Sequence, residues 1–349
     1  MNIYRDPSKE IIDNIIKLLN KKKFLSVVNQ ALVLTKKYPQ AYMVWNILGA
    51  ANNYLGKEQE ASEAFKVVTK LNPTFPESFN NFGISQQKLG NLKEAIYLFK
   101  KALLLRPNSY IFHTNIGLVF KEQNKLKKAI ESFKSALSLN PKYTEAYYNI
   151  GNTFKEQDKL NEAINSFKKV LSLNPKHAEA YNNMGAILKE QGKLEQSIEA
   201  CRKSILLKPD YDEAYNNLGA VLIDDGKFEQ SIEACKKAIL LKPDYAEAYN
   251  NMGMALKEQG DLNGSIESYK KALAIKSDYT LAYYNLSFPC NFKGDLENGL
   301  KLYEWRLKKK KPKARTPREN LIWDGKKSVS GKKFFVYEEQ GPWRCYPVL

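Results

Sequence analysis

Apolar and small side chains recur every three or four positions along most of the chain, with polar residues between them. Within residues 212–245 one such run ends at Leu222 and a second begins at Phe228. Spacing of this kind is typical of amphipathic helices. Gly226 between the runs indicates a turn, and Pro243 prevents the second helix from continuing. The segment is therefore predicted to fold as a helix–turn–helix, with about 14 residues in each helix.

The same pattern repeats with a fixed period of 34 residues. Prolines keep this interval at Pro39, Pro73, Pro107, Pro141, Pro175, Pro209 and Pro243. Glycines keep it at another point of the unit, at Gly49, Gly83, Gly117, Gly151, Gly185, Gly219 and Gly253. A constant period is the signature of a solenoid, in which each unit packs only against its neighbours.

The order of the repeated residues resembles the tetratricopeptide repeat (TPR). Residues 42–75 carry its pattern as Trp45, Leu48, Gly49, Ala61, Phe65 and Pro73, with Asn52 where Tyr is usual. The resemblance covers seven units, namely 42–75, 76–109, 110–143, 144–177, 178–211, 212–245 and 246–279. It implies an all-α fold, a right-handed TPR superhelix built as an α-solenoid of helix–turn–helix repeats.

The helical glycines predict a close helix contact, because Gly inside a helix costs about 1 kcal/mol relative to Ala. The small residues at Ala61, Ala95, Ala129 and Ala163 are expected to be the matching contact on the second helix. Serine takes this position later, at Ser197, Ser231 and Ser265.

The two ends depart from the repeat. Residues 1–41 keep its phase but carry Ile15 in place of glycine, which indicates an N-terminal capping hairpin. Residues 280–307 are interpreted as a degenerate terminal repeat with a capping helix over 300–307. Pro289 is expected to break or kink the first helix of this repeat, because it removes a backbone donor.

One position of the first helix is occupied by Asn in seven successive units, and only Ile47 in the first unit breaks the series. The row consists of Asn81, Asn115, Asn149, Asn183, Asn217, Asn251 and Asn285. Asn is a mediocre helix former, yet each amide offers a donor and an acceptor that suit the main chain of an extended peptide. The row resembles the asparagine ladder of O-linked N-acetylglucosamine transferases, which implies that it lines a concave groove that binds protein segments. Recent duplication of the repeats is the alternative explanation.

Composition indicates which kinds of binding site the chain is expected to lack. Four cysteines do not form a disulfide framework, and Cys201 and Cys235 stand where earlier units have Phe. His113 and His177 occupy positions that are aromatic elsewhere. We therefore expect no metal and no cofactor. The chain also lacks an apolar run long enough to span a bilayer and a signal-peptide stretch, so a cytoplasmic location is expected.

The net charge of +17 is concentrated at the ends. Residues 301–349 hold 14 Lys and Arg against 5 Asp and Glu, and residues 1–37 hold 8 against 3. The run Lys308–Lys311 begins a basic linker, which composition favours as a solvated segment and which alternatively contacts nucleic acid or an anionic membrane. The sequence shows no known nucleic-acid-binding module, so we expect no specific binding to nucleic acid. Acidic residues at the second position of most units, such as Glu145 and Glu213, argue against a carboxylate clamp.

Residues 308–349 leave the period and are expected to be a poorly ordered remnant. Trp323-Asp324-Gly325 and a strand candidate at 334–337, which runs into Glu339-Gln340-Gly341, are similar to bacterial proteins in which TPR repeats precede a glycosyltransferase-like domain. The likeness stops after Gly341, and a one-base shift in the gene would restore it. The chain carries no catalytic constellation, so we expect a peptide-binding scaffold. The alternative is the substrate-recognition arm of a protein O-glycosyltransferase whose catalytic domain is absent from this chain.

Overall fold

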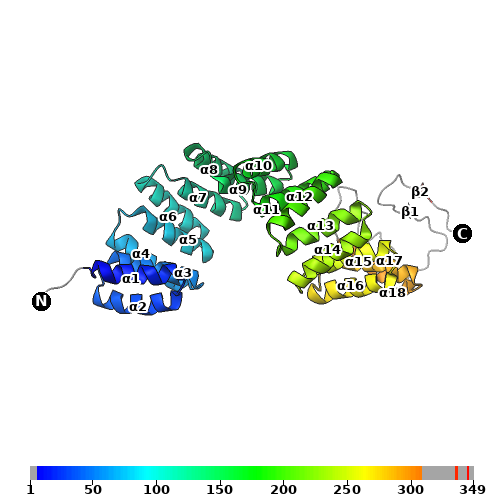
Figure 1. Cartoon of the computed structure of the whole chain (residues 1–349), viewed down its shortest axis with the longest axis horizontal. Helices are drawn as coiled ribbons and strands as arrows, with labels where there is room; N and C mark the ends of the chain where they lie inside the picture. Colours follow the sequence, from blue (N-terminus) through cyan, green and yellow to red (C-terminus); the bar gives the residue numbers. More distant parts are fainter. Residues whose placement is uncertain (1–5, 309–334, 337–343, 346–349) are drawn as a thin grey trace. The chain divides into compact units, whose positions relative to one another are not determined.

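Helices form nearly all of the computed structural model, which describes residues 6–308, 335–336 and 344–345 (Figure 1). Eighteen α-helices occur within these residues, and consecutive helices pair as hairpins. They are α1 (Lys9–Asn20), α2 (Phe24–Lys37), α3 (Tyr42–Tyr54), α4 (Glu58–Leu71), α5 (Pro76–Lys88), α6 (Leu92–Leu105), α7 (Tyr110–Glu122), α8 (Leu126–Leu139), α9 (Thr144–Glu156), α10 (Leu160–Leu173), α11 (Ala178–Glu190), α12 (Leu194–Leu207), α13 (Asp212–Asp224), α14 (Phe228–Leu241), α15 (Ala246–Glu258), α16 (Leu262–Ile275), α17 (Thr280–Phe292) and α18 (Leu296–Tyr303). The all-α solenoid predicted from the period is confirmed.

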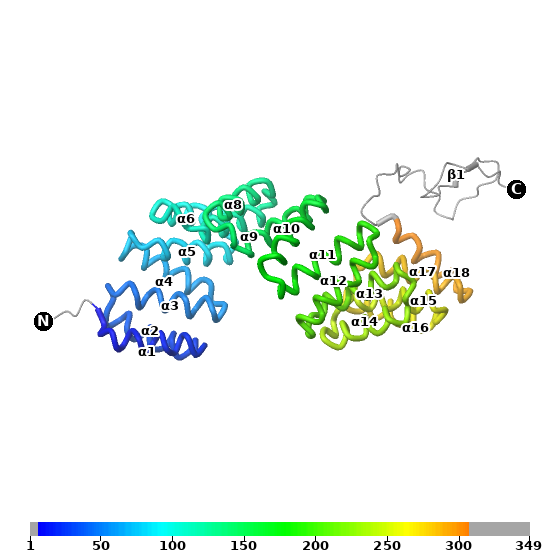
Figure 2. Tube along the Cα trace, turned by 45° about the horizontal axis from the view of Figure 1, so that its top comes forward, coloured from blue at the N-terminus to red at the C-terminus, as the bar shows by residue number. Residues whose placement is uncertain are grey.

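The chain divides into two compact units, one ending at Asp225 and the other beginning at Gly226. Unit 1 contains α1 to α13, and unit 2 contains α14 to α18. Figure 2 follows the Cα trace through the successive hairpins.

Each hairpin turn contains one residue in the left-handed backbone region, which ends the first helix. Glycine fills this position six times, as at Gly90 with φ +80° and Gly192 with φ +71°. Lys22, Asn124 and Asp158 take the same conformation with φ of 57–58°. A left-handed residue after a helix turns the chain away from the helix axis, and glycine adopts it without steric cost.

The helical glycines allow the second helix of their hairpin to lie close, but at Gly83 and Gly151 the nearest group is not the small residue that was predicted. A Cβ added at Gly151 would lie 2.8 Å from Cε1 of Phe167, and one at Gly83 would lie 2.7 Å from Cε1 of Phe99. The ring, one helical turn beyond the small residue, is thus the nearest group. Ala95 and Ala163 are fully buried at the helix contact but are not the atoms that exclude a side chain at glycine.

Serine at the small position has a further role. The Ser197 Oγ donates to the Gly185 carbonyl at 2.7 Å, and the Ser265 Oγ donates to the Gly253 carbonyl at 2.8 Å. Both serines are buried, so these bonds satisfy hydroxyl groups that would otherwise be desolvated without a partner.

At the N-terminal end, Ile15 is buried in a core with residues of α2 and α3, where later repeats place glycine. Near the other end, α17 runs unbroken through Pro289, so the expected break is absent. Pro289 lies late in the helix and is buried, and packing of α17 against α16 and α18 holds the helix despite the missing donor. The predicted closing helix over 300–307 begins earlier, as α18, and tightens into a 3₁₀ helix, η1 (Glu304–Lys308).

Two short strands follow. The strand candidate at 334–337 is present as β1 (Phe335–Val336), and it pairs antiparallel with β2 (Arg344–Cys345). The expected basic linker and the rest of the expected remnant, residues 309–334, 337–343 and 346–349, lie outside the described residues.

Candidate functional site

The first helices of successive repeats form one continuous surface of unit 1. From α3 to α13, each first helix of unit 1 touches the one that follows it, whereas no two second helices of unit 1 touch each other. A stack that is closer together on one side curves toward that side. The first helices therefore lie on the inner side of unit 1, and the residues of the asparagine row in unit 1 belong to these helices.

The asparagine row connects adjacent repeats. In unit 1, the Asn115 Nδ2 donates to Asn80 Oδ1 at 2.7 Å, and the Asn217 Nδ2 donates to Asn182 Oδ1 at 2.9 Å. In unit 2, the Asn285 Nδ2 donates in the same way to Asn250 Oδ1 at 2.9 Å. Each bond spans 35 positions, so it joins a row residue to the neighbouring position of the preceding repeat.

Two other residues of the row also donate to the preceding repeat. The Asn183 Nδ2 donates to the Tyr148 hydroxyl at 3.1 Å and to Asn152 Oδ1 at 3.0 Å. The Asn81 Nδ2 donates to Asn46 Oδ1 at 3.4 Å, which extends the series to the first repeat. The row thus has a structural role between repeats that spacing alone did not reveal.

Asn149 is the exception. The residue 35 positions earlier is Thr114, whose hydroxyl donates to the Tyr110 carbonyl at 2.9 Å. The shorter side chain and its local bond leave the Asn149 amide without a hydrogen-bond partner among the described residues. Asn149 is half-buried, so solvent can reach the side chain and satisfy the donor and acceptor groups of its amide.

Three oxygens of the row remain available as acceptors, whereas Asn81 Oδ1 accepts from the Asn80 Nδ2 at 3.3 Å. The Oδ1 atoms of Asn115, Asn183 and Asn217 accept no hydrogen bond from any described residue. An amide carries two donor hydrogens and an oxygen with two lone pairs, and the inter-repeat bonds use the donors first. The inner face of unit 1 therefore presents a row of carbonyl oxygens, with a complete amide at Asn149. Asn251 lies at the equivalent position of α15 in unit 2.

Aromatic side chains flank this row. The Tyr148 ring stacks on His177 with centroids 4.9 Å apart, and the Asn182 Nδ2 donates to the Tyr211 hydroxyl at 3.2 Å. Burial, with the nearby Glu213 carboxylate, raises the pKa of the Tyr211 hydroxyl, which therefore stays protonated. Tyr148 and Asn182 occupy the position directly before the row in their repeats. The signal that could have identified them as partners is their constant offset from the row.

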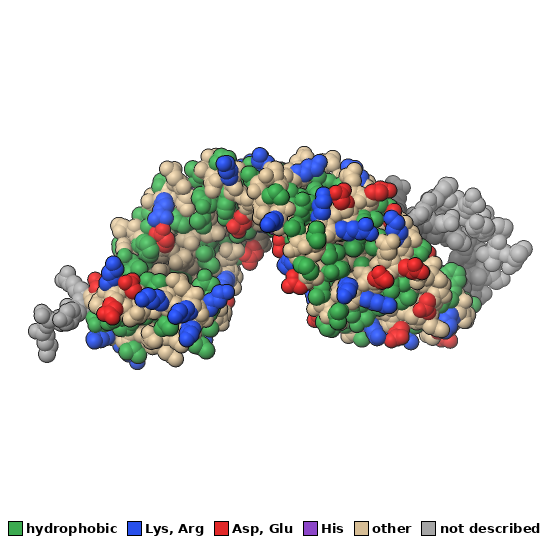
Figure 3. All heavy atoms as spheres, in the orientation of Figure 1, with side chains coloured by type: hydrophobic (Ala, Val, Ile, Leu, Met, Phe, Trp, Pro, Cys, Tyr) green, Lys and Arg blue, Asp and Glu red, His purple; other side chains and the backbone are tan. Residues whose placement is uncertain are grey.

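Several acidic residues at the second position of the repeats form ion pairs or hydrogen bonds with nearby side chains. Glu77 pairs with Arg106 at 2.5 Å, and Glu179 pairs with Lys208 at 3.3 Å. Glu145 accepts from the Tyr143 hydroxyl at 2.6 Å. Basic and acidic side chains are interspersed over the face shown in Figure 3. The inner surface thus carries neutral amides between paired charges.

Other chemistry is scarce in the part of the chain that the structure describes. That part holds no group of three His, Cys, Asp or Glu residues placed to bind a metal ion. Cys201, Cys235 and Cys290 are free buried thiols, and burial raises the pKa of Cys201 to about 12. No helix of the described chain is both long and apolar enough to cross a bilayer.

Solved structures of repeat proteins share this architecture. A tetratricopeptide repeat protein from Parabacteroides merdae is 20% identical over 71% of this chain and 98% of its own, with a TM-score of 0.55. A chain of the APC/C hetero-tetramer Cut9–Hcn1 is 15% identical over 82% of this chain and 56% of its own, with a TM-score of 0.59. YrrB, described as a TPR protein with an unusual peptide-binding site, is 22% identical over 53% of this chain and 95% of its own, with a TM-score of 0.45. No curated protein matched.

Family models identify the repeats directly. Models described as TPR repeat or tetratricopeptide repeat match residues 76–109, 117–158, 151–192, 178–211 and 210–278. Together these segments cover more than half of the chain. The segments 76–109 and 178–211 each contain one whole hairpin, whereas 117–158 and 151–192 begin inside a first helix. The chain is therefore a tetratricopeptide-repeat protein.

Proposed function

We propose that this protein is an interaction scaffold that binds extended segments of other proteins along the inner face of unit 1. The observation that carries the proposal is the row of asparagine oxygens at Asn115, Asn183 and Asn217, together with the unpartnered amide of Asn149. Acceptors repeated at each hairpin suit the backbone N–H groups of an extended chain. Such contacts hold the main chain whatever its side chains are.

The hydrogen bonds between repeats determine which atoms of the row can bind a peptide. Because the row donors are used between repeats, the peptide is bound chiefly through its own N–H groups. Flanking side chains such as Tyr148 and Tyr211 then contact the peptide side chains and provide selectivity. The glycosyltransferase alternative rests on residues 308–349, most of which lie outside the described residues.

The test uses the full chain and peptides selected from a random library for binding to it. Asn149→Ala should weaken binding without lowering stability, because the Asn149 side chain makes no hydrogen bond to a described residue. The triple variant Asn149→Ala, Asn183→Ala and Asn217→Ala should weaken binding more than tenfold, at about 1 kcal/mol per net hydrogen bond. Asn29→Ala, on the exposed face of α2, is the matched control.

The peptide provides a second readout. Methylation of alternate backbone nitrogens should abolish binding, whereas alanine substitution of most peptide side chains should have a smaller effect. If the triple variant binds the selected peptides as tightly as the wild type, the row has only its structural role and the proposal is wrong.

A further inference from the structure

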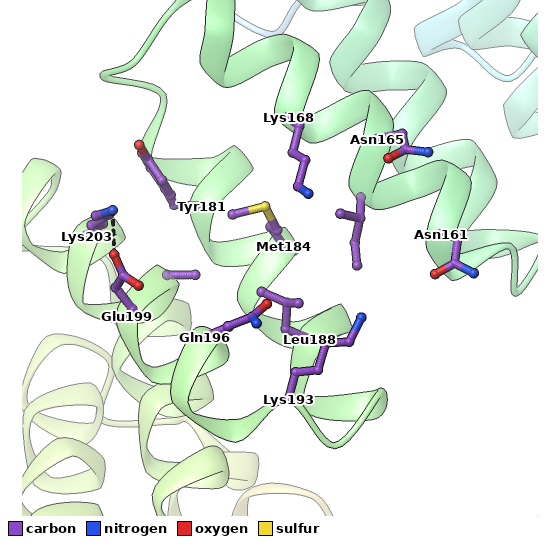
Figure 4. Close-up of a pocket in the computed structure, with 12 residues that line it drawn as sticks. Asn161, Asn165, Lys168, Tyr181, Met184, Leu188, Lys193, Gln196, Glu199 and Lys203 are labelled. Atoms are coloured by element: carbon purple, nitrogen blue, oxygen red, sulfur yellow. Dashed lines mark ion pairs between the residues drawn. The ribbon is translucent and has the colours of Figure 1, made fainter.

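A groove lies on the opposite side of unit 1, between the second helices α10 and α12. It has a volume of about 510 Å³ and is lined by residues of α10, α11 and α12 and the turn before α12 (Figure 4). Its floor is apolar and includes Ile164, Met184 and Leu188. Asn161, Asn165 and Gln196 contribute neutral amides to its rim. This size falls within the range typical of sites that hold small ligands or peptide side chains, roughly 300–1,000 Å³.

The charges around the groove are not balanced in pairs. The charge of Lys203 is already compensated, because its Nζ pairs with Glu199 Oε1 at 2.7 Å. The same Nζ lies 5.9 Å from the centre of the Tyr181 ring. Lys168 has no carboxylate partner within the described residues. Lys193 donates only to the neutral Gln191 Oε1, at 2.8 Å.

Figure 4 shows Lys168 extending toward the middle of the groove above Met184, with Lys193 at the other wall. Two uncompensated ammonium groups therefore border one apolar floor. A ligand that complements both features carries carboxylates beside an apolar side chain.

We propose that this groove binds an acidic segment of a partner protein, with an apolar side chain on Met184 and Leu188 and flanking carboxylates at Lys168 and Lys193. The Asn165 amide has no hydrogen-bond partner among the described residues and is placed to bond the main chain of the segment. This surface is separate from the asparagine row.

Alternative anions fit the groove less well. A phosphate ion would engage the lysines but would leave the apolar floor in water. Nucleic acid binds along continuous basic stripes. Carboxylates interrupt such a stripe here. Glu131 and Glu162 stand at the positions one repeat before Asn165 and Gln196, and Glu195 lies on α12 itself. The groove therefore suits nucleic acid less well than an acidic peptide.

The experiment measures fluorescence anisotropy of labelled peptides with the full chain. The probe has a leucine pair flanked by glutamates, and two comparison peptides replace either the glutamates by glutamine or the leucines by serine. The glutamate–leucine peptide should bind at least about tenfold more tightly than either comparison peptide. Its affinity should fall as salt rises from about 0.05 M to about 0.5 M.

The variant Lys168→Gln/Lys193→Gln should weaken binding about tenfold, since each exposed ion pair contributes modestly. The matched control, Lys134→Gln/Lys159→Gln, removes the same charges from the equivalent positions one repeat earlier. It should stay within about twofold of the wild type. All four lysines are exposed, so neither variant disturbs the core.

Equal weakening by both variants, or equal binding of the glutamate and glutamine peptides, would overturn the proposal. Equal binding of the leucine and serine peptides, with displacement by inorganic phosphate or a single-stranded oligonucleotide, would also overturn it and would indicate a general anion surface. The asparagine triple variant should leave this affinity unchanged, so failure of either proposal can be recognised separately.

Discussion

Alanine at position 151 would place a methyl group where the Phe167 ring already lies. Glycine within a helix is about 1 kcal/mol less favourable than alanine, so the substitution alone should stabilise an isolated helix. In the folded protein the added Cβ would lie 2.8 Å from Cε1 and 2.9 Å from Cζ of Phe167, which is fully buried. Overpacking of a core typically costs about 1–3 kcal/mol. We therefore expect Gly151→Ala to destabilise the hairpin by about 1 kcal/mol net.

A double-mutant cycle identifies the cause. Phe167→Ala should lower stability by about 3–5 kcal/mol through loss of the buried ring. In that background Gly151→Ala should become stabilising, because the methyl group enters the vacated space and the helix gains its propensity. The coupling energy should be about 2 kcal/mol, well above the value for independent sites.

The assay is urea unfolding followed by circular dichroism, combined with amide hydrogen exchange in α9 and α10. Exchange is needed because long repeat arrays depart from two-state unfolding, and it reports the local free energy of opening. Stabilisation by Gly151→Ala alone would refute the reasoning. An identical effect of Gly151→Ala in both backgrounds would show that the ring is not the obstacle.

Three further predictions concern the backbone, the row and the thiols. Gly90→Ala should destabilise the fold by about 1 kcal/mol through backbone strain alone, since Gly90 has φ +80° and open space around it; a thermal melt would check this. Asn217→Asp should cost about 1–2 kcal/mol in urea unfolding, because a carboxylate cannot donate to Asn182 Oδ1, whereas Asn149→Asp should have little effect. Burial raises the pKa of the Cys201 and Cys235 thiols from 9.0 to about 12. The unfolded chain therefore releases these protons first, and stability should fall from pH 9 toward pH 12, less steeply in Cys201→Ala/Cys235→Ala.

The repeat pattern predicted the helices closely because the information is local. The run that begins at Phe228 is α14, and the run that ends at Leu222 lies in α13. Gly226 takes a left-handed conformation with φ +72°, as expected of a residue that ends a helix. Period, turn residues and amphipathic spacing are all properties of neighbouring residues, so they can be interpreted without a tertiary structure.

The errors concern contacts between elements. Sequence spacing indicated that glycine allows close approach, but not that the Phe167 ring would be the neighbour, because the rotation of the second helix selects the side chain in contact. Pro289 was expected to break or kink its helix, yet the helix continues through it, because burial against neighbouring helices outweighed the lost hydrogen bond. Tertiary packing overrides local preference when the buried surface is sufficient.

The properties of the asparagine row likewise fall into those that the sequence predicts and those that it does not. Its period and residue type could be identified from the sequence, since each copy recurs at the same interval. Its hydrogen bonds depend on how one hairpin is rotated against the next, which brings Asn217 to Asn182 but leaves Asn149 beside a threonine that bonds elsewhere. The sequence by itself determined the repeat and its helices. Only the stacking of hairpins decided which amide atoms are used inside the protein and which remain for a partner, because that choice depends on distances between chain segments 35 residues apart.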